Sequence, residues 1–117
     1  MKKILICDED EKVRESLKLI LGNHYELIAT DDPQQALHVL MNAPDIGVAL
    51  FDFKILELND GELLLQLKNQ HPKIRIIEVT GYQSVDPGEI KKTGISGSIG
   101  KPFKSQKILE VIKKNLK

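Results

Sequence analysis

The sequence predicts an α/β fold in which one doubly wound, five-stranded parallel sheet is flanked by helices on both faces. Short apolar runs, typical of strands buried on both sides, alternate with longer segments whose apolar residues recur at helical spacing. Because strand–helix–strand crossovers are right-handed, successive units build one parallel sheet and cover both of its faces with helices. The chain has 117 residues and no internal repeat or linker, so we expect residues 1–117 to form a single domain.

The first two strands and helices are predicted in the first third of the chain. Residues 4–7 form an unbroken apolar run, and residues 25–29 predict the second strand. The helix between them is predicted to end at Gly22, and Asp32 and Pro33 match the N-cap and first position of the next helix. The apolar residues expected to face the core from these helices are Val13, Leu17, Ile20, Leu21, Ala36, Leu37, Leu40 and Met41.

Three further strands are predicted at residues 46–51, 74–79 and 95–99, the last of them interrupted by glycine. The helix expected within residues 82–93 should be short or irregular, because Pro87 is followed by glycine there. Two other helices are predicted, one after Asp60-Gly61 and one at the C-terminal end. Their expected buried residues are Leu63, Leu64 and Leu67 for the first, and Ile108, Ile112 and Leu116, or Leu109 and Val111 beside them, for the second.

Composition narrows the function classes. Seventeen acidic and seventeen basic residues give a formal net charge of zero, which does not favour binding of nucleic acid or of an anionic membrane. The single cysteine, Cys7, cannot form an internal disulfide and is expected to be a small buried apolar residue. The apolar run at residues 4–7 is too short for a signal peptide or a membrane span, so we expect a soluble cytoplasmic protein.

Polar residues gather where the predicted strands end. In doubly wound sheets, ligands bind outside the carboxyl ends of the strands. The residues that follow the first, third, fourth and fifth strands are Asp8, Glu9 and Asp10, then Asp52, Thr80 and Lys101.

This set of side chains predicts phosphoryl transfer. Neighbouring carboxylates repel one another, and Mg²⁺ removes that penalty because it prefers oxygen ligands. Lys101 can hold a phosphoryl oxygen as a point charge, and Thr80 can donate a hydroxyl hydrogen bond to it. Asp52 is then the nucleophile, and the product is an acyl phosphate.

Each residue also has a plainer interpretation. Asp8 could cap the first helix, Glu9 or Asp10 could be solvated acids of its first turn, and Thr80 could be an ordinary strand-end hydroxyl. Chance placement of such groups at the ends of four strands is much less probable than any one of these interpretations alone.

Four segments together resemble the receiver domain of two-component response regulators over essentially the whole chain: 4-ILICDEDE-11, 50-LFDFKILELNDG-61, 76-IIEVTGY-82 and 99-IGKPF-103. The resemblance implies a flavodoxin-like fold with strand order 2-1-3-4-5. It further implies Asp52 as phosphoacceptor, Thr80 as switch hydroxyl, Lys101 as the phosphate-contacting lysine and a cis bond before Pro102. The implied Mg²⁺ ligands are Asp8, Glu9, Asp52 and the backbone carbonyl of Lys54.

The sequence departs from the family pattern at several positions. Leu56 replaces a proline, and the segment 52–61 is one residue longer than usual, which would displace the backbone around Lys54. Ser98 replaces the aromatic partner of the switch hydroxyl, and Pro87 interrupts a helix that relatives usually continue. These changes leave the acceptor chemistry intact and put the usual route of signalling in question.

The expected partners are a histidine kinase or phosphotransfer protein, and a downstream protein target or fused output domain. We expect that the chain is not an enzyme and that it does not bind nucleic acid or a membrane directly. We also expect it to be a monomer or a weak dimer. No output region follows the last predicted helix, so we expect that the chain either works alone or is a fragment.

The main alternative is a pseudo-receiver that acts as a phosphorylation-independent interaction module. Flavin or nucleotide binding and Mg²⁺-dependent phosphatase chemistry are ranked lower, because the acidic first loop repels anions and no second carboxylate follows Asp52 closely.

Overall fold

The computed structural model describes residues 2–81 and 94–116 and contains the predicted sheet. Five parallel strands lie in the order β2-β1-β3-β4-β5, which confirms the order implied by the resemblance. The strands are β1 (Lys3–Cys7), β2 (Glu26–Thr30), β3 (Val48–Asp52), β4 (Arg75–Thr80) and β5 (Gly97–Gly100).

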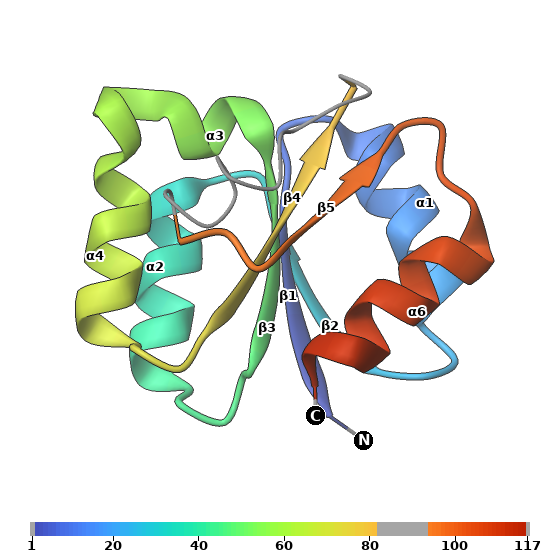
Figure 1. The fold of residues 1–117 in the computed structure, drawn as a ribbon, viewed down its shortest axis with the longest axis horizontal. Helices are drawn as coiled ribbons and strands as arrows, with labels where there is room; N and C mark the ends of the chain where they lie inside the picture. Colours follow the sequence, from blue (N-terminus) through green and yellow to red (C-terminus); the bar gives the residue numbers. More distant parts are fainter. Residues whose placement is uncertain (1, 82–93, 117) are drawn as a thin grey trace.

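Helices cover both faces of the sheet (Figure 1). The helices are α1 (Glu11–Leu21), α2 (Pro33–Asn42), α3 (Phe53–Glu57), the 3₁₀ helix η1 (Leu58–Gly61), α4 (Glu62–Gln70) and α6 (Ser105–Asn115). Figure 1 shows α2, α3 and α4 on one face and α1 and α6 on the other. The helix expected within residues 82–93 lies outside the described residues.

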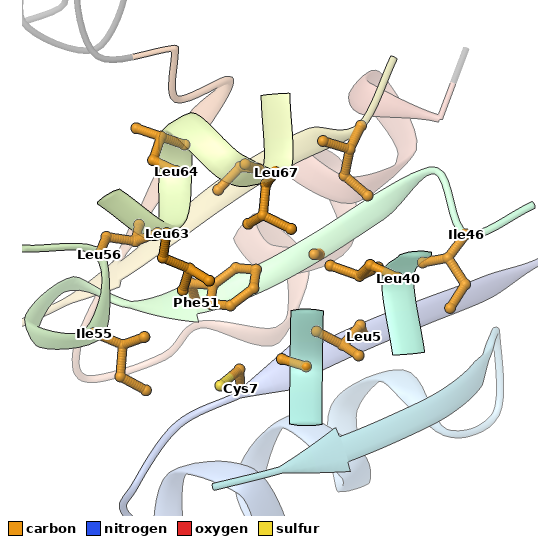
Figure 2. Packing of buried hydrophobic residues seen from close by; sticks show 14 residues of the cluster. Leu5, Cys7, Leu40, Ile46, Phe51, Ile55, Leu56, Leu63, Leu64 and Leu67 are labelled. Atoms are coloured by element: carbon orange, nitrogen blue, oxygen red, sulfur yellow. The ribbon is translucent and has the colours of Figure 1, made fainter. Parts of the chain in front are cut away.

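Alternate residues of the central strands point into two separate cores. Phe51 is fully buried on the side of α4, where it lies among Leu63, Leu64 and Leu67 (Figure 2). On the opposite side the central strands pack against α1 and α6. Burial of one such large apolar side chain contributes about 1.5–3 kcal/mol relative to exposure, so the two cores hold the strands in register.

Two helices begin at an aspartate N-cap, of which only the one at Asp32 was predicted. The side chain of Asp32 accepts a hydrogen bond from the backbone N–H of Gln34 and Pro33 follows it, as predicted. The first helix is capped in the same way by Asp10, which accepts from the N–H of Lys12 at 2.9 Å. Asp8 is therefore not the cap of α1.

The structure differs from the sequence-based expectations at Met41, at α3 and at the ends of several strands. Met41 is 52% exposed instead of facing the core, because it lies in the last turn of α2, about 100° around the helix axis from the buried Leu40. The short helix α3, which directly follows β3, was not predicted. Strands β2, β3, β4 and β5 also end one residue later than predicted, so Asp52 and Thr80 are themselves the last residues of their strands.

The helices were compared in length and hydropathy with a membrane-spanning helix. None of the helices in residues 2–81 and 94–116 is both long enough and apolar enough to cross a bilayer.

Candidate functional site

The ends of four adjacent strands form one edge that contains the predicted site residues. Asp52 ends β3 and pairs with Val79 of β4, and Thr80 ends β4 and pairs with Gly100 of β5. The backbone N–H of Lys101 donates to the carbonyl of Thr80 at 2.8 Å. The sheet order therefore brings together Asp8, Asp52, Thr80 and Lys101, which lie far apart in sequence.

Asp52 is buried at this edge and has no role in capping the helix that follows it. Its side chain is only 8% exposed, and its backbone is extended (φ −58°, ψ 137°) where α3 begins. The carboxylate makes no capping hydrogen bond to α3. A buried carboxylate without such a structural task is costly unless a ligand or a charge compensates it.

Asp8 follows β1 and is 2% exposed. Its Oδ1 accepts a hydrogen bond from the N–H of Asp10 at 2.8 Å, whereas its Oδ2 is buried without a hydrogen-bond partner. Burial raises the pKa of Asp8; the hydrogen bond from Asp10 lowers it, the negative charge of Asp52 raises it and the positive charge of Lys101 lowers it. The two carboxyl groups and the ammonium group thus act on one another across the edge.

Glu9 is exposed, and the structure does not bring its side chain into a ready-made cluster with the two aspartates. Within residues 2–81 and 94–116, no three His, Cys, Asp or Glu side chains gather closely enough to hold a metal ion. The backbone of this loop is nevertheless held in place, because Arg14 Nη1 donates to the carbonyls of Asp8 at 2.7 Å and Glu9 at 3.1 Å.

The residues at this edge suit a hard divalent cation. Two buried carboxylates, one with an orphaned oxygen, are the donors that Mg²⁺ prefers, and a cation would offset their mutual repulsion. The side chains present therefore fit a Mg²⁺ ion.

The longer segment after Asp52 forms a regular turn of α3 and then an unusual bend. Lys54 lies in α3 with an exposed side chain. Beyond α3, Asn59 (φ 51°), Asp60 (φ 56°) and Gly61 (φ 81°) are consecutive left-handed residues. Asn, Asp and Gly tolerate this conformation best, so the composition of the bend suits its backbone.

Thr80 and Lys101 lie on the far side of the edge from Asp8. Thr80 is 2% exposed, and Lys101 is half-buried. The peptide bond between Lys101 and Pro102 is cis, as the resemblance implied. Asp31 and Asp32, which follow β2, are both exposed, and Asp32 caps α2.

The sequence analysis missed Glu78, a buried acid of β4. It is 2% exposed, and its Oε1 has no hydrogen-bond partner. It lies opposite Ser98 in the β4–β5 ladder, at the position where the sequence lacks the family's aromatic residue. A signal was available, since Glu78 is the single charged residue within the run 76-IIEVT-80.

The chain is similar in sequence to one family of proteins and to several individual proteins. The sequence profile of the response regulator receiver domain matches residues 4–113. Accessory gene regulator protein A of Staphylococcus aureus is 29% identical over 92 residues, which cover 71% of this chain and 39% of that protein. Transcriptional regulatory protein ComA of Bacillus subtilis is 30% identical over 117 residues, which cover 96% of this chain and 55% of that protein.

Solved structures support the fold. The chemotaxis protein CheY4 of Vibrio cholerae superposes with a TM-score of 0.81 at 22% identity, over 98% of each chain. The chain spans only part of the length of the two curated relatives: 55% of ComA and 39% of the accessory gene regulator protein.

Proposed function

This chain belongs to the response regulator receiver domain family, and from that membership we propose that Asp52 accepts a phosphoryl group from a histidine kinase or a histidine phosphotransfer protein in a Mg²⁺-dependent reaction. The observation that carries the proposal is the buried Asp52 carboxylate, which has no capping task and lies within electrostatic reach of Asp8. Such a group suits a nucleophile better than a structural residue.

The proposed transfer step forms one bond to phosphorus and breaks another. A carboxylate oxygen of Asp52 attacks the phosphorus of a phosphohistidine, and a new O–P bond forms while the N–P bond breaks. The electron pair of that bond returns to the imidazole of the donor, which takes up a proton. The product on this chain is an acyl phosphate at Asp52, and one phosphoryl group is bound per chain, so the proposal assigns no turnover of a small substrate.

The metal-binding part of the proposal rests on Asp8. Together with Glu9, Asp52 and the backbone carbonyl of Lys54, it would hold the Mg²⁺ ion, which when bound supplies positive charge to the phosphoryl oxygens. The orphaned Oδ2 of Asp8 supports this assignment, because a buried carboxylate oxygen without a partner leaves a ligand position available.

Lys101 and Thr80 are proposed to hold the transferred group from the other side. The ammonium group of Lys101 would pair with a phosphoryl oxygen, which places positive charge where negative charge accumulates. Thr80 would turn its hydroxyl toward the same phosphoryl group after transfer. The backbone hydrogen bond of 2.8 Å between these residues would couple movement of Thr80 to the end of β5.

The proposal is tested with acetyl phosphate as a small phosphodonor. The purified chain is incubated with donor and Mg²⁺ and then weighed intact. We expect a gain of one phosphoryl group in the wild type and in the matched control Asp31→Asn, an exposed acid after β2 at the same edge. Chelation of Mg²⁺ and Asp52→Asn should both abolish the gain. An undiminished gain in Asp52→Asn would overturn the assignment.

A second candidate function is that of a phosphorylation-independent interaction module. The pair Glu78–Ser98 favours it, because a buried acid and a small hydroxyl stand where an aromatic switch residue is expected in relatives. Binding to a partner protein that is equally tight for wild type, Asp52→Asn and the phosphorylated chain would select this function. Affinity that changes several-fold on phosphorylation would exclude it.

A further inference from the structure

A cavity of about 600 Å³ opens at the edge of the sheet opposite to Asp52. Lys2 and Lys3 lie in its wall where β1 begins, Lys73 and Arg75 where β4 begins, Asp45 in the loop before β3 and Asn115 at the end of α6. Figure 1 shows that the two ends of the chain meet at this edge. It is a separate place from the proposed phosphoacceptor site.

The charge of this cavity differs sharply from that of the whole chain. Four cationic side chains and a single acidic one line it, although the chain as a whole has a formal net charge of zero. Asp45 forms an ion pair with Lys3 at 3.5 Å. No other ion pair in the described parts of the chain involves a residue that lines the cavity, so the charges of Lys2, Lys73 and Arg75 are not neutralised there.

Several contacts fix the walls of the cavity. Lys2 Nζ donates to the carbonyl of Leu116 at 3.2 Å, which joins the beginning of β1 to the end of α6. The backbone N–H of Arg75 donates to the carbonyl of Gly47 at 2.9 Å, which joins β4 to the segment before β3. The cations are therefore mounted on a framework that already exists without a ligand, which lowers the entropic cost of binding.

Positive charge also accumulates behind the wall formed by β4. Lys68 Nζ donates to the carbonyl of Ile74 at 3.0 Å, next to Arg75 in sequence. Burial lowers the pKa of Lys68, and the positive charge of Arg75 lowers it further. Like charges are thus held close enough to repel one another, a cost that a bound anion would reduce.

We propose that this cavity binds a small molecule that bears several phosphate groups. The guanidinium of Arg75 can hold two phosphate oxygens at once, and the lysines can each pair with a further oxygen as point charges. The cations come from the beginnings of two strands, β1 and β4, that are separated in the sheet by β3, so a ligand with several phosphate groups can pair with both sets. Among the described residues that line it none is aromatic, so recognition would depend on charge rather than on stacking against a base.

The test uses inorganic tripolyphosphate as the probe, in chelator and without phosphodonor, so that the Mg²⁺ site takes no part. Isothermal titration calorimetry measures the affinity, and backbone amide NMR shifts locate the site. We expect saturable binding that moves the amides of residues 2–3, 73–75 and 115–116, with orthophosphate bound at least tenfold more weakly. The double variant Lys73→Gln/Arg75→Gln should lose at least tenfold in affinity, and both side chains are exposed, so the fold should be retained.

Two matched variants distinguish binding at this cavity from nonspecific electrostatic attraction to the whole surface. Lys107→Gln removes an exposed cation of α6 that does not line the cavity, and its affinity should match the wild type. Asp45→Asn removes the one acid of the lining and should raise affinity several-fold. Equal weakening by Lys107→Gln, equal affinity for orthophosphate, or shifts confined to the edge at Asp52 would each overturn the proposal. Because Asp52→Asn should bind the probe normally, failure here would leave the phosphoacceptor proposal untouched.

Discussion

Glu78 of β4 lies opposite Ser98 of β5, and the Oε1 oxygen of Glu78 is buried without a hydrogen-bond partner. Burial raises the pKa of Glu78, and the negative charge of Glu57 raises it further. The folded state therefore favours the protonated acid more than the unfolded chain does. A carboxyl group in this position makes the stability of the domain depend on pH.

The substitution Glu78→Gln should stabilise the domain at neutral pH by about 1–2 kcal/mol, because it removes an uncompensated buried charge. The folded-state pKa is raised, so the wild type loses stability as pH rises from below the ordinary glutamate value of 4.5 through the raised value. The advantage of the variant should shrink toward zero on acidification below that ordinary value. Urea unfolding at several pH values measures both effects.

The control for this prediction is Glu110→Gln, which alters an exposed acid of α6 and should leave stability nearly unchanged at every pH. A Glu78→Gln variant whose stability parallels that of the wild type across the acidic range would show that the carboxyl group is solvated in solution.

Asp8→Asn should separate metal binding from folding. The amide oxygen keeps the hydrogen bond from the N–H of Asp10, while the repulsion with Asp52 disappears. In chelator we expect thermal stability to rise by about 1 kcal/mol, and we expect the Mg²⁺ affinity to fall by about tenfold or more. Thermal unfolding and calorimetric titration measure the two quantities, with Asp31→Asn as control. Loss of stability together with unchanged Mg²⁺ binding would contradict the proposed ligand role.

Cys7 should be chemically inert in the folded protein. It is fully buried in β1, and burial, followed by the negative charges of Asp8 and other nearby aspartates, raises its pKa to about 12. Reaction requires the thiolate, so we expect negligible labelling by a thiol reagent at pH 8 and complete labelling in denaturant. Rapid stoichiometric labelling of the native chain would show that this strand opens readily.

Substitution of Asp60 in the left-handed bend before α4 should change the stability of the domain in a direction that depends on the new residue. Asp60→Gly keeps φ at a value that glycine adopts without steric cost, so we expect stability to rise by several tenths of a kcal/mol, offset in part by the greater freedom of the unfolded chain. Asp60→Val should destabilise by about 1–2 kcal/mol because a β-branched residue is strained there. Denaturant unfolding of the two variants gives the comparison. Equal stability of both would show that the bend relaxes in solution.

Much of the fold could be predicted because burial leaves a strong pattern in the sequence. Strand β3 is buried at every position, and its residues before Asp52 form an uninterrupted apolar run. The apolar spacing of α1 and α2 matches their buried faces, and α2 begins at the predicted N-cap Asp32, whereas the cap of α1 is Asp10 and was not predicted. The site residues followed from the ends of the strands, since a parallel sheet gathers those ends at one edge.

The features that escaped prediction depend on contacts between distant segments. Helix α3 has five residues, too few for a hydrophobic period, and it follows β3 without an N-cap hydrogen bond. The burial of Glu78 arises from the position of β4 between β3 and β5, which a local pattern does not reveal. Whether Glu9 and Lys54 complete a metal site depends on side-chain and backbone positions that no spacing in the sequence encodes.

The most direct test of the central proposal identifies the phosphorylated residue itself. The chain is phosphorylated with acetyl phosphate and Mg²⁺, reduced with borohydride, which converts an aspartyl phosphate to homoserine, and then mapped by peptide mass spectrometry. We expect homoserine at position 52 and at no other aspartate. Homoserine at another position, or an unmodified position 52 in a chain whose mass has risen by a phosphoryl group, would contradict the role of Asp52 as the phosphoacceptor.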